Sequence, residues 1–222
     1  MHEIDPTQVR AVVFDLGGVF LEGGPDRVKS FGPRHGLGQE RWDAIRQELF
    51  VLGDLWGAVE RAELSLERFG QELQSRMAAQ GVPISLAQAL NFMGTPGDPE
   101  RMPVREEIVG ACRALKARMP TALLTNNIRE WRTGWRQRLD VAGLFDLVVD
   151  SSEVGCRKPE AEIYRLVEAG LGLPGPSLLF VDDLGVNLKA ARQRGWQTVK
   201  YEHTAAVLDV LGRVAATRAP GR

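Results

Sequence analysis

The sequence predicts an α/β fold in which an open parallel sheet forms the core and a helical cap is inserted after the first strand. Short apolar runs alternate with stretches of helical periodicity, as expected when helices connect buried parallel strands. One long region, residues 21–103, interrupts this alternation and contains no convincing strand. The chain has 222 residues, of which 44% are hydrophobic, so it is long enough to bury such a core.

The predicted strands are apolar on both faces, which is typical of a sheet covered by helices on both sides. Between them, apolar residues recur at helical spacing from Val104 to Leu115, Pro159 suits a first helical turn, and a further helical pattern ends on Gly195. These features together predict a Rossmann-like core. The five strand candidates are AVVF (11–14), TALLT (121–125), LFDLVVD (144–150), SLLFVDD (177–183) and WQTVK (196–200).

The inserted region has the periodicity of amphipathic helices. Trp42, Ile45 and Leu49 share one helical face, and the same spacing recurs from Leu66 to Leu73. A stretch rich in proline and glycine, residues 93–103, reads as the linker back to the sheet, and the tail 216–222 is expected to fray. The predicted domains are therefore a core, residues 1–20 and 104–222, and a helical cap, residues 21–103.

The composition limits the compartment and the partners. The 28 basic and 29 acidic side chains nearly cancel, so no overall field favours nucleic acid or an anionic membrane. Two cysteines, Cys112 and Cys156, form neither a disulfide framework nor a metal cluster, and no apolar signal core or membrane span is present. A cytoplasmic protein is expected, with a small-molecule partner, and a homodimer is left open.

Polar side chains close three of the predicted strands. Because the carboxyl ends of parallel strands meet at one edge of the sheet, we expect these side chains to lie together. Lys158 follows the third strand by eight residues and can reach the same crevice from its loop. The strand-end residues are Asp15, Thr125 with Asn126, and Asp182 with Asp183.

Carboxylates that converge at one edge repel each other unless a cation lies between them, and oxygen ligands without His or Cys suit Mg²⁺. Lys158 and the Thr125 hydroxyl can then donate to the oxygens of a bound phosphate. Asp15 is left to attack phosphorus and form an aspartyl phosphate. Gly17 and Gly18 allow a sharp turn that brings a backbone carbonyl to the metal and amides to the phosphate.

The segments AVVFDLGGVF, ALLTNN, GCRKPE and LLFVDDLGVNLKAARQRGW resemble, in order, the four motifs of the haloacid dehalogenase-like hydrolase superfamily. The last two most resemble the subgroup of the amino-terminal phosphatase domain of soluble epoxide hydrolase and the sugar-1-phosphate phosphatases. The resemblance implies a Mg²⁺-dependent phosphatase whose cap closes over the site and selects a small phosphorylated substrate. It implies Asp15 as nucleophile and metal ligand, Gly17 as a carbonyl ligand, Asp182 and Asp183 as metal ligands, Gly18, Thr125 and Asn126 as phosphoryl-binding residues, and Lys158 as the residue that balances the phosphoryl charge.

Gly17 departs from the family pattern, since most phosphatases of the superfamily have a general acid and base aspartate there. Removing such a group typically costs roughly 100 to 10,000-fold in rate. Some members similar to the sugar-1-phosphate phosphatases also have glycine at this position. The acid then comes from water or the cap, or the leaving group needs little help, which favours anomeric, acyl and aryl phosphates. The alternatives are attack on carbon with loss of halide, and ligand or partner binding without turnover.

Several other residues have a simpler interpretation. Trp42 and Trp56 are expected in the cap core rather than against substrate, and Trp131 and Trp135 are expected to pack. The arginine-rich stretch 127–138 reads as a solvated helix face. One alternative places Arg34 and His35 in the cleft as substitutes for the missing acid.

Overall fold

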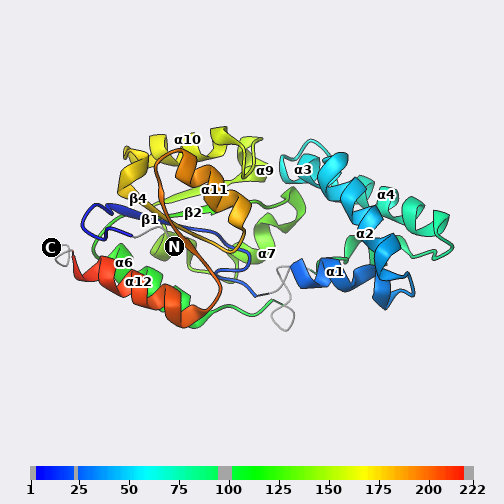
Figure 1. The fold of residues 1–222 in the computed structure, drawn as a ribbon, viewed down its shortest axis with the longest axis horizontal. Helices are drawn as coiled ribbons and strands as arrows, with labels where there is room; N and C mark the ends of the chain where they lie inside the picture. The colour runs from blue at the N-terminus through cyan, green and yellow to red at the C-terminus, as the bar shows by residue number, and fades with distance from the viewer. Residues whose placement is uncertain (1–3, 23–24, 95–101, 218–222) are drawn as a thin grey trace.

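The structure is a computed structural model, and it describes residues 4–22, 25–94 and 102–217. Within this part of the chain, five parallel strands form one sheet in the order β3-β2-β1-β4-β5 (Figure 1). The predicted fold class is confirmed. The strands are β1 (Ala11–Phe14), β2 (Thr121–Thr125), β3 (Leu147–Asp150), β4 (Leu178–Asp182) and β5 (Gln197–Lys200).

Helices cover both faces of the sheet, with α6 and α12 on one side and α10 and α11 on the other (Figure 1). Alternate residues of β1 point to opposite faces: Phe14 packs in the cluster that contains Ile108 of α6, and Val13 in the cluster that contains Ile163 of α10. This two-sided burial explains the continuous apolar strands. The covering helices are α6 (Glu106–Lys116), α10 (Ala161–Leu171), α11 (Gly185–Gln193) and α12 (Thr204–Ala216).

Shorter helices lie in the connections of the sheet. They are η2 (Arg129–Trp131), α7 (Arg132–Arg136), α8 (Val141–Leu144), α9 (Ser151–Val154) and η3 (Gly175–Ser177).

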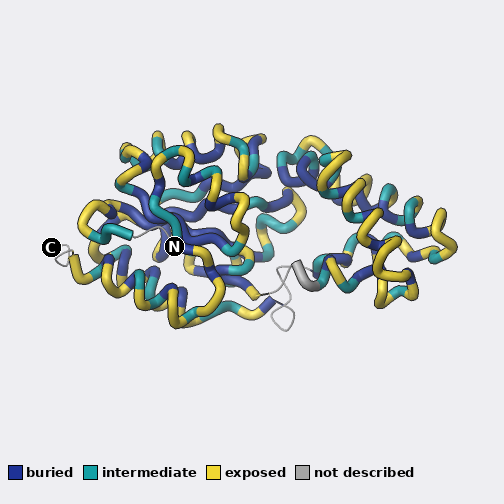
Figure 2. Tube along the Cα trace, in the orientation of Figure 1, coloured by how far each residue is buried: buried dark blue, intermediate teal, exposed yellow. Residues whose placement is uncertain are grey.

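A helical lobe lies beside the carboxyl-terminal edge of the sheet, and buried residues run through the inside of both lobes (Figures 1 and 2). The helical lobe has its own apolar core, in which Trp42, Phe69 and Phe92 are fully buried. No strand occurs among its described residues. Its helices are α1 (Pro25–Arg34), α2 (Gln39–Gln47), the π-helix η1 (Glu48–Leu52), α3 (Leu55–Glu60), α4 (Leu66–Ala79) and α5 (Leu86–Leu90).

The chain enters and leaves this lobe at one place. Leu21 pairs with Val104 in an antiparallel bridge, and the Arg105 amide donates to the Phe20 carbonyl at 2.8 Å. The predicted domain boundaries, after residue 20 and before residue 104, fall beside this bridge. The division into two domains stays a prediction.

Several details differ from the sequence expectation or lie outside the described residues. Strand β4 is one residue shorter at each end than predicted, and β5 begins at Gln197 rather than at Trp196. Strand β3 begins at Leu147 rather than at Leu144, because Leu144 ends helix α8. Pro159 precedes helix α10 by two residues and lies outside its first turn. Most of the predicted linker and the end of the predicted tail lie outside the described residues. No helix in the described ranges has both the length and the apolar character needed to cross a membrane.

Candidate active site

The candidate site lies where the strand order reverses. Strand β1 has β2 on one side and β4 on the other, so the chain leaves their carboxyl ends toward opposite faces and a crevice opens there. Asp15 follows β1 directly, Thr125 ends β2 and Asp182 ends β4. The topology therefore places the three predicted strand-end positions at one point.

Lys158 joins two of these strand ends from the loop before α10. Its Nζ lies 2.7 Å from Asp15 Oδ1 and 2.8 Å from Asp182 Oδ2. The lysine side chain is only 1% exposed, and those of Asp15 and Asp182 are 9% and 0% exposed. One buried ammonium group thus bridges two buried carboxylates.

The charges in this cluster do not balance, because three carboxylates, those of Asp15, Asp182 and Asp183, share one ammonium group. Burial raises the pKa of Asp15 well above its usual range; the charge of Lys158 opposes this rise, and Asp182 and Asp183 add to it. Burial alone would lower the pKa of Lys158, but attraction to Asp15 and Asp182 outweighs it and the pKa is raised. The cluster therefore has an excess of carboxylates, whose negative charge a bound cation would neutralise.

The carboxylates have the arrangement of a metal site. Asp15, Asp182 and Asp183 each offer one oxygen, and these oxygens lie within 4.8 Å of one another. Hard oxygen donors alone, with several positions left for water, match the preference of Mg²⁺. The donor set of this chain therefore fits the predicted metal.

The two adjacent aspartates differ in their surroundings. Asp182 accepts hydrogen bonds from the Leu184 amide at 2.7 Å and from Asn187 Nδ2 at 3.0 and 3.1 Å, in addition to its contact with Lys158. Asp183 lines the adjacent cavity, and burial followed by repulsion from Asp182 raises its pKa. Asp183 is thus the more open of the two carboxylates.

Asn126 fastens the end of β2 to the loop that carries Lys158. Its Oδ1 accepts from the Lys158 amide at 2.8 Å, and its Nδ2 donates to the Lys158 carbonyl at 2.9 Å. Thr125 is 2% exposed, and its hydroxyl donates weakly to the Asn126 carbonyl at 3.4 Å. The side chain of Asn126 therefore positions Lys158, a role that the sequence did not suggest.

Gly17 and Gly18 follow Asp15, but they differ in their need for glycine. Gly18 has a φ of +77°, and a Cβ there would lie 2.4 Å from a carboxylate oxygen of Asp183. A Cβ at Gly17 would meet no atom within 4 Å, and its φ is outside the left-handed region. The Gly18 amide, predicted to bind the phosphoryl group, donates to the Leu21 carbonyl at 2.8 Å in this structure.

We expect Gly18→Ala to destabilise the protein by about 1–3 kcal/mol, because alanine is strained at positive φ and its Cβ would displace Asp183. The matched change Gly17→Ala should leave the unfolding free energy within about 0.5 kcal/mol of the wild type. Urea denaturation measures both values. Equal losses in the two variants would contradict the assigned difference.

A cavity of about 670 Å³ lies between the two lobes and opens onto the cluster. Its lining includes Asp15, Lys158 and Asp183 of the cluster, together with Thr125. Its walls are largely apolar and combine side chains of both lobes, among them Leu21, Phe50, Trp56, Met93, Trp131 and Leu184. A ligand could thus reach Asp15 through a largely apolar passage.

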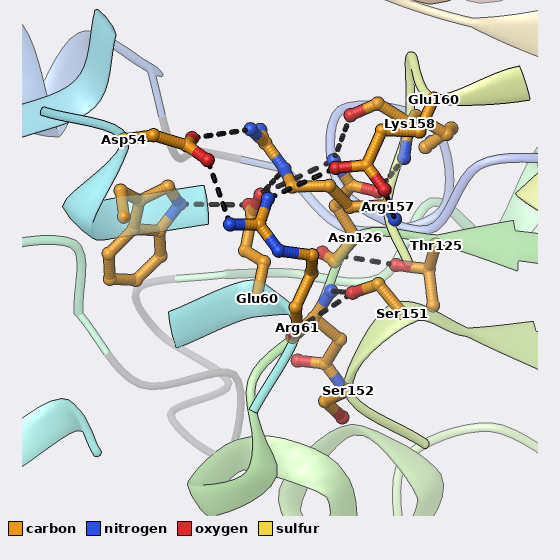
Figure 3. A network of polar contacts seen from close by, with 12 residues as sticks. Asp54, Glu60, Arg61, Thr125, Asn126, Ser151, Ser152, Arg157, Lys158 and Glu160 are labelled. Carbon is orange, nitrogen blue, oxygen red and sulfur yellow. Dashed lines mark hydrogen bonds and ion pairs between the residues drawn. The ribbon is translucent and has the colours of Figure 1, made fainter. Parts of the chain in front are cut away.

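A polar network that the sequence reading missed connects the helical lobe to this site (Figure 3). Glu60, at the end of α3, forms an ion pair with Arg157, and its Oε2 lies 3.3 Å from Asn126 Nδ2. Arg61 contacts Asp54 at 2.8 Å and Glu160 at 3.0 Å. In the sequence, this network is indicated only by the position of Arg157 next to Lys158, because the partners of Arg157 in the helical lobe are distant along the chain.

The other expectations have mixed outcomes. Trp56 is buried in the lobe core, as expected, but it also lines the cavity, as Trp131 does. His35 contacts the Phe31 carbonyl and Arg34 donates to the Ser30 carbonyl, and neither lines the cavity. The arginine-rich stretch is more than a solvated face, because its arginines bind segments next to it, as Arg136 does with two bonds to Glu153.

Comparison with known proteins matches the chain to one family. A sequence model of the haloacid dehalogenase-like hydrolases matches residues 9–195. The chain is 29% identical to acyl-CoA dehydrogenase family member 10 of Mus musculus over 215 residues, which is 91% of this chain and 19% of the relative. It is 33% identical to bifunctional epoxide hydrolase 2 of Rattus norvegicus over 125 residues, 53% of this chain and 22% of the relative. The chain thus spans about a fifth of the length of these two relatives.

Two further similarities extend over most of this chain and most of the other protein. A Mycobacterium tuberculosis protein named as a phosphatase is 26% identical over 210 residues, 90% of this chain and 91% of the relative. A HAD family enzyme of Bacteroides thetaiotaomicron, solved in complex with magnesium and inorganic phosphate, superposes with a TM-score of 0.63 at 19% identity and covers 90% of this chain and 98% of its own. The structural match shows a shared fold.

Proposed function

The chain belongs to the haloacid dehalogenase-like hydrolase family, and we propose that it is a Mg²⁺-dependent phosphatase that forms an aspartyl phosphate on Asp15. One observation carries this proposal. Lys158 bridges Asp15 and Asp182 at the carboxyl ends of β1 and β4, and Asp183 adds a third carboxylate to the cluster. This arrangement combines a nucleophile, a fixed positive charge and a set of metal ligands in one crevice.

In the proposed site, Asp15, Asp182, Asp183 and the backbone carbonyl of Gly17 hold the metal directly or through water. When bound, Mg²⁺ neutralises negative charge on the phosphoryl oxygens and on the carboxylates. This role fits the excess of carboxylates over ammonium groups in the cluster.

The chain's own residues then perform the transfer. Asp15 Oδ attacks phosphorus in line and the ester oxygen leaves, so two displacements replace one. Lys158 balances charge on the phosphoryl group, and Thr125 and Asn126 bind its oxygens together with Gly18. The Gly18 amide can do so only after releasing the Leu21 carbonyl. Water attack on the aspartyl phosphate regenerates Asp15.

We also propose that the helical lobe acts as a cap that selects the substrate. Its side chains Phe50 and Trp56 form part of the apolar wall of the cavity. Transfer of apolar surface from water to such a wall is favourable by roughly 25 cal/mol per Å². A small phosphate ester with an apolar or aryl body therefore fits the passage better than a uniformly polar one.

Phosphate release from aryl, acyl, anomeric and alkyl phosphates, with Mg²⁺ or with a chelator, tests this proposal. We expect release to depend on Mg²⁺. Rates that fall from aryl to simple alkyl phosphates would show that Gly17 has shifted the burden to the leaving group, whereas equal rates would show that another group of the protein supplies the acid. Binding of phosphate esters without release from any of them would instead support the alternative of a binding protein.

Halide release from a 2-haloacid tests the remaining family chemistry, attack of Asp15 on carbon. That reaction needs no metal, whereas three carboxylates converge here. We expect no halide release, and metal-independent release would overturn the assignment of a phosphatase.

A further inference from the structure

The proposed reaction needs a proton for the leaving group and a base for the attacking water, and Gly17 can provide neither. Four carboxylates line the cavity among the residues that the structure describes: those of Asp15, Asp43, Glu60 and Asp183. Asp15 and Asp183 belong to the nucleophile and metal cluster. Asp43 is exposed and pairs with Arg46 on its own helix. Glu60 is the remaining candidate.

We propose that Glu60, which extends from the helical lobe into the cavity, is the general acid and base that replaces the side chain missing at Gly17. This inference rests on the proposed phosphatase function and assigns a further catalytic residue to it. Glu60 lines the same cavity as Asp15 but belongs to the helical lobe, and the leaving group of an in-line displacement at Asp15 departs away from Asp15 into this cavity.

The carboxylate of Glu60 is held in place on the site side of α3 (Figure 3). Trp56 Nε1 donates to its Oε1 at 2.8 Å, and its Oε2 faces Arg157 and Asn126. Asn126 is also the residue that fixes the backbone of Lys158. One amide side chain thus links the Glu60 carboxylate to the residue that balances the phosphoryl charge.

The surroundings of Glu60 also suit proton transfer. The residue is 7% exposed, and burial raises its pKa although Arg157 and Trp56 favour the charged form. A carboxyl group with a raised pKa can hold a proton closer to neutral pH, as a general acid requires. The nearby positive charges, those of Arg157 and Lys158, stabilise the carboxylate once the proton has left.

Two displacements make up the proposed reaction. The bond from phosphorus to the ester oxygen breaks as Asp15 bonds to phosphorus, and the leaving oxygen takes the proton of Glu60. Water then attacks the phosphorus and gives a proton to the Glu60 carboxylate. The bond from phosphorus to Asp15 breaks, inorganic phosphate leaves, and both carboxyl groups return to their starting states.

Glu60→Gln separates these steps, because glutamine keeps the size and the contact with Trp56 but cannot exchange the proton. With nitrophenyl phosphate, whose leaving group needs little acid, we expect a burst of one nitrophenolate per active site and then a steady rate at least about 100-fold below the wild type. With a simple alkyl phosphate, we expect no burst and a loss of at least about 100-fold. Acid quenching of the reaction with nitrophenyl phosphate should trap the phosphorylated protein.

Glu63→Gln is the matched control, since Glu63 pairs with Arg61 in the same segment but does not line the cavity. We expect wild-type kinetics from it on both esters. If Glu60→Gln lowers the melting temperature, Glu60→Asp serves in its place; it keeps the carboxyl group but withdraws it from the site, and we expect a smaller loss on the alkyl ester.

Gly17→Asp supplies a second, independent test. A Cβ at Gly17 would meet no atom within 4 Å, so the backbone at this position has space for the start of a side chain. In the Glu60→Gln background it should restore the alkyl phosphate rate by at least about tenfold. This rescue is not expected if Glu60 acts only by holding the lobes together.

Equal losses on both esters without a burst, no loss at all, or no rescue by Gly17→Asp would overturn the role of Glu60. These outcomes leave the proposed function intact, because phosphate release by the wild type is measured in the same experiment. A wild-type protein that releases no phosphate from any ester would overturn both.

Discussion

Asp15→Asn is expected to abolish phosphate release, with a loss of at least about 10,000-fold, as found when an enzyme loses its nucleophile. The amide of asparagine is a poor nucleophile toward phosphorus. Its size matches that of aspartate, and its oxygen can still accept from Lys158, so the geometry of the cluster should persist. Phosphate release and acid-quench trapping of phosphorylated protein measure the effect.

The same change is not expected to destabilise the fold. Burial and the neighbouring carboxylates raise the pKa of Asp15, so its charged form is costly in the folded state without metal. A neutral amide removes that cost, and the metal-free melting temperature should equal or exceed that of the wild type. Asp209→Asn, at an exposed ion pair on α12, is the matched control and should leave both quantities unchanged. Residual release above about one per cent would contradict Asp15 as nucleophile.

Strands β1 to β4 could be predicted from the sequence because each is short, largely apolar and ends at or next to a polar residue, whereas β5 (QTVK) has Val199 as its one aliphatic residue. Strand β2 has the predicted bounds, since a polar Thr125 marks its end and helices cover both of its faces. Strand β3 was extended too far at its start, because Leu144 and Phe145 are as apolar as the strand itself. An apolar run alone does not separate a buried helix end from a buried strand.

The convergence of Asp15, Thr125 and Asp182 was predictable for a topological reason. Once the strands are parallel, their carboxyl ends share an edge, and polar residues at those ends share a site. The prediction needed no side-chain geometry. The finer assignment of roles, including the predicted use of the Gly18 amide, depends on local hydrogen bonds that the sequence does not reveal.

The network of Glu60, Arg157 and Asn126 could not be predicted from the sequence, because the strand topology does not determine it. It depends on how the helical lobe lies against the sheet, and its members belong to separate segments. Arg61 and Glu160, which form part of the same network, are 99 positions apart. In the sequence, the charged members Glu60, Arg157 and Glu160 each have the pattern of a solvated charge on a helix or loop, and their contacts with the other lobe appear only when the two lobes are placed together.

Lys158→Met is expected to lower both stability and activity, because methionine fills the space of the lysine stem without its charge. Lys158 is buried between Asp15 and Asp182, and removing one partner of a buried ion pair typically costs about 3–5 kcal/mol. Phosphate release should fall by roughly 100 to 1,000-fold, since a fixed charge at the phosphoryl group is lost. Denaturation in the absence of metal and steady-state phosphate release measure the two effects.

The stability loss should also depend on pH and on Mg²⁺, which a simple packing defect would not show. Without Lys158, nothing opposes the effect of burial, which raises the pKa of Asp15 above its unfolded value, so the penalty is absent at acidic pH and grows as the pH rises toward neutrality. Mg²⁺ supplies the missing positive charge and should recover part of the loss at neutral pH. Lys200→Met, at an exposed ion pair with Glu202, is the matched control and should show none of these effects. The loss of stability in Lys158→Met could instead be the same at acidic and at neutral pH and insensitive to Mg²⁺. That result would mean that Lys158 acts by packing and not through its charge.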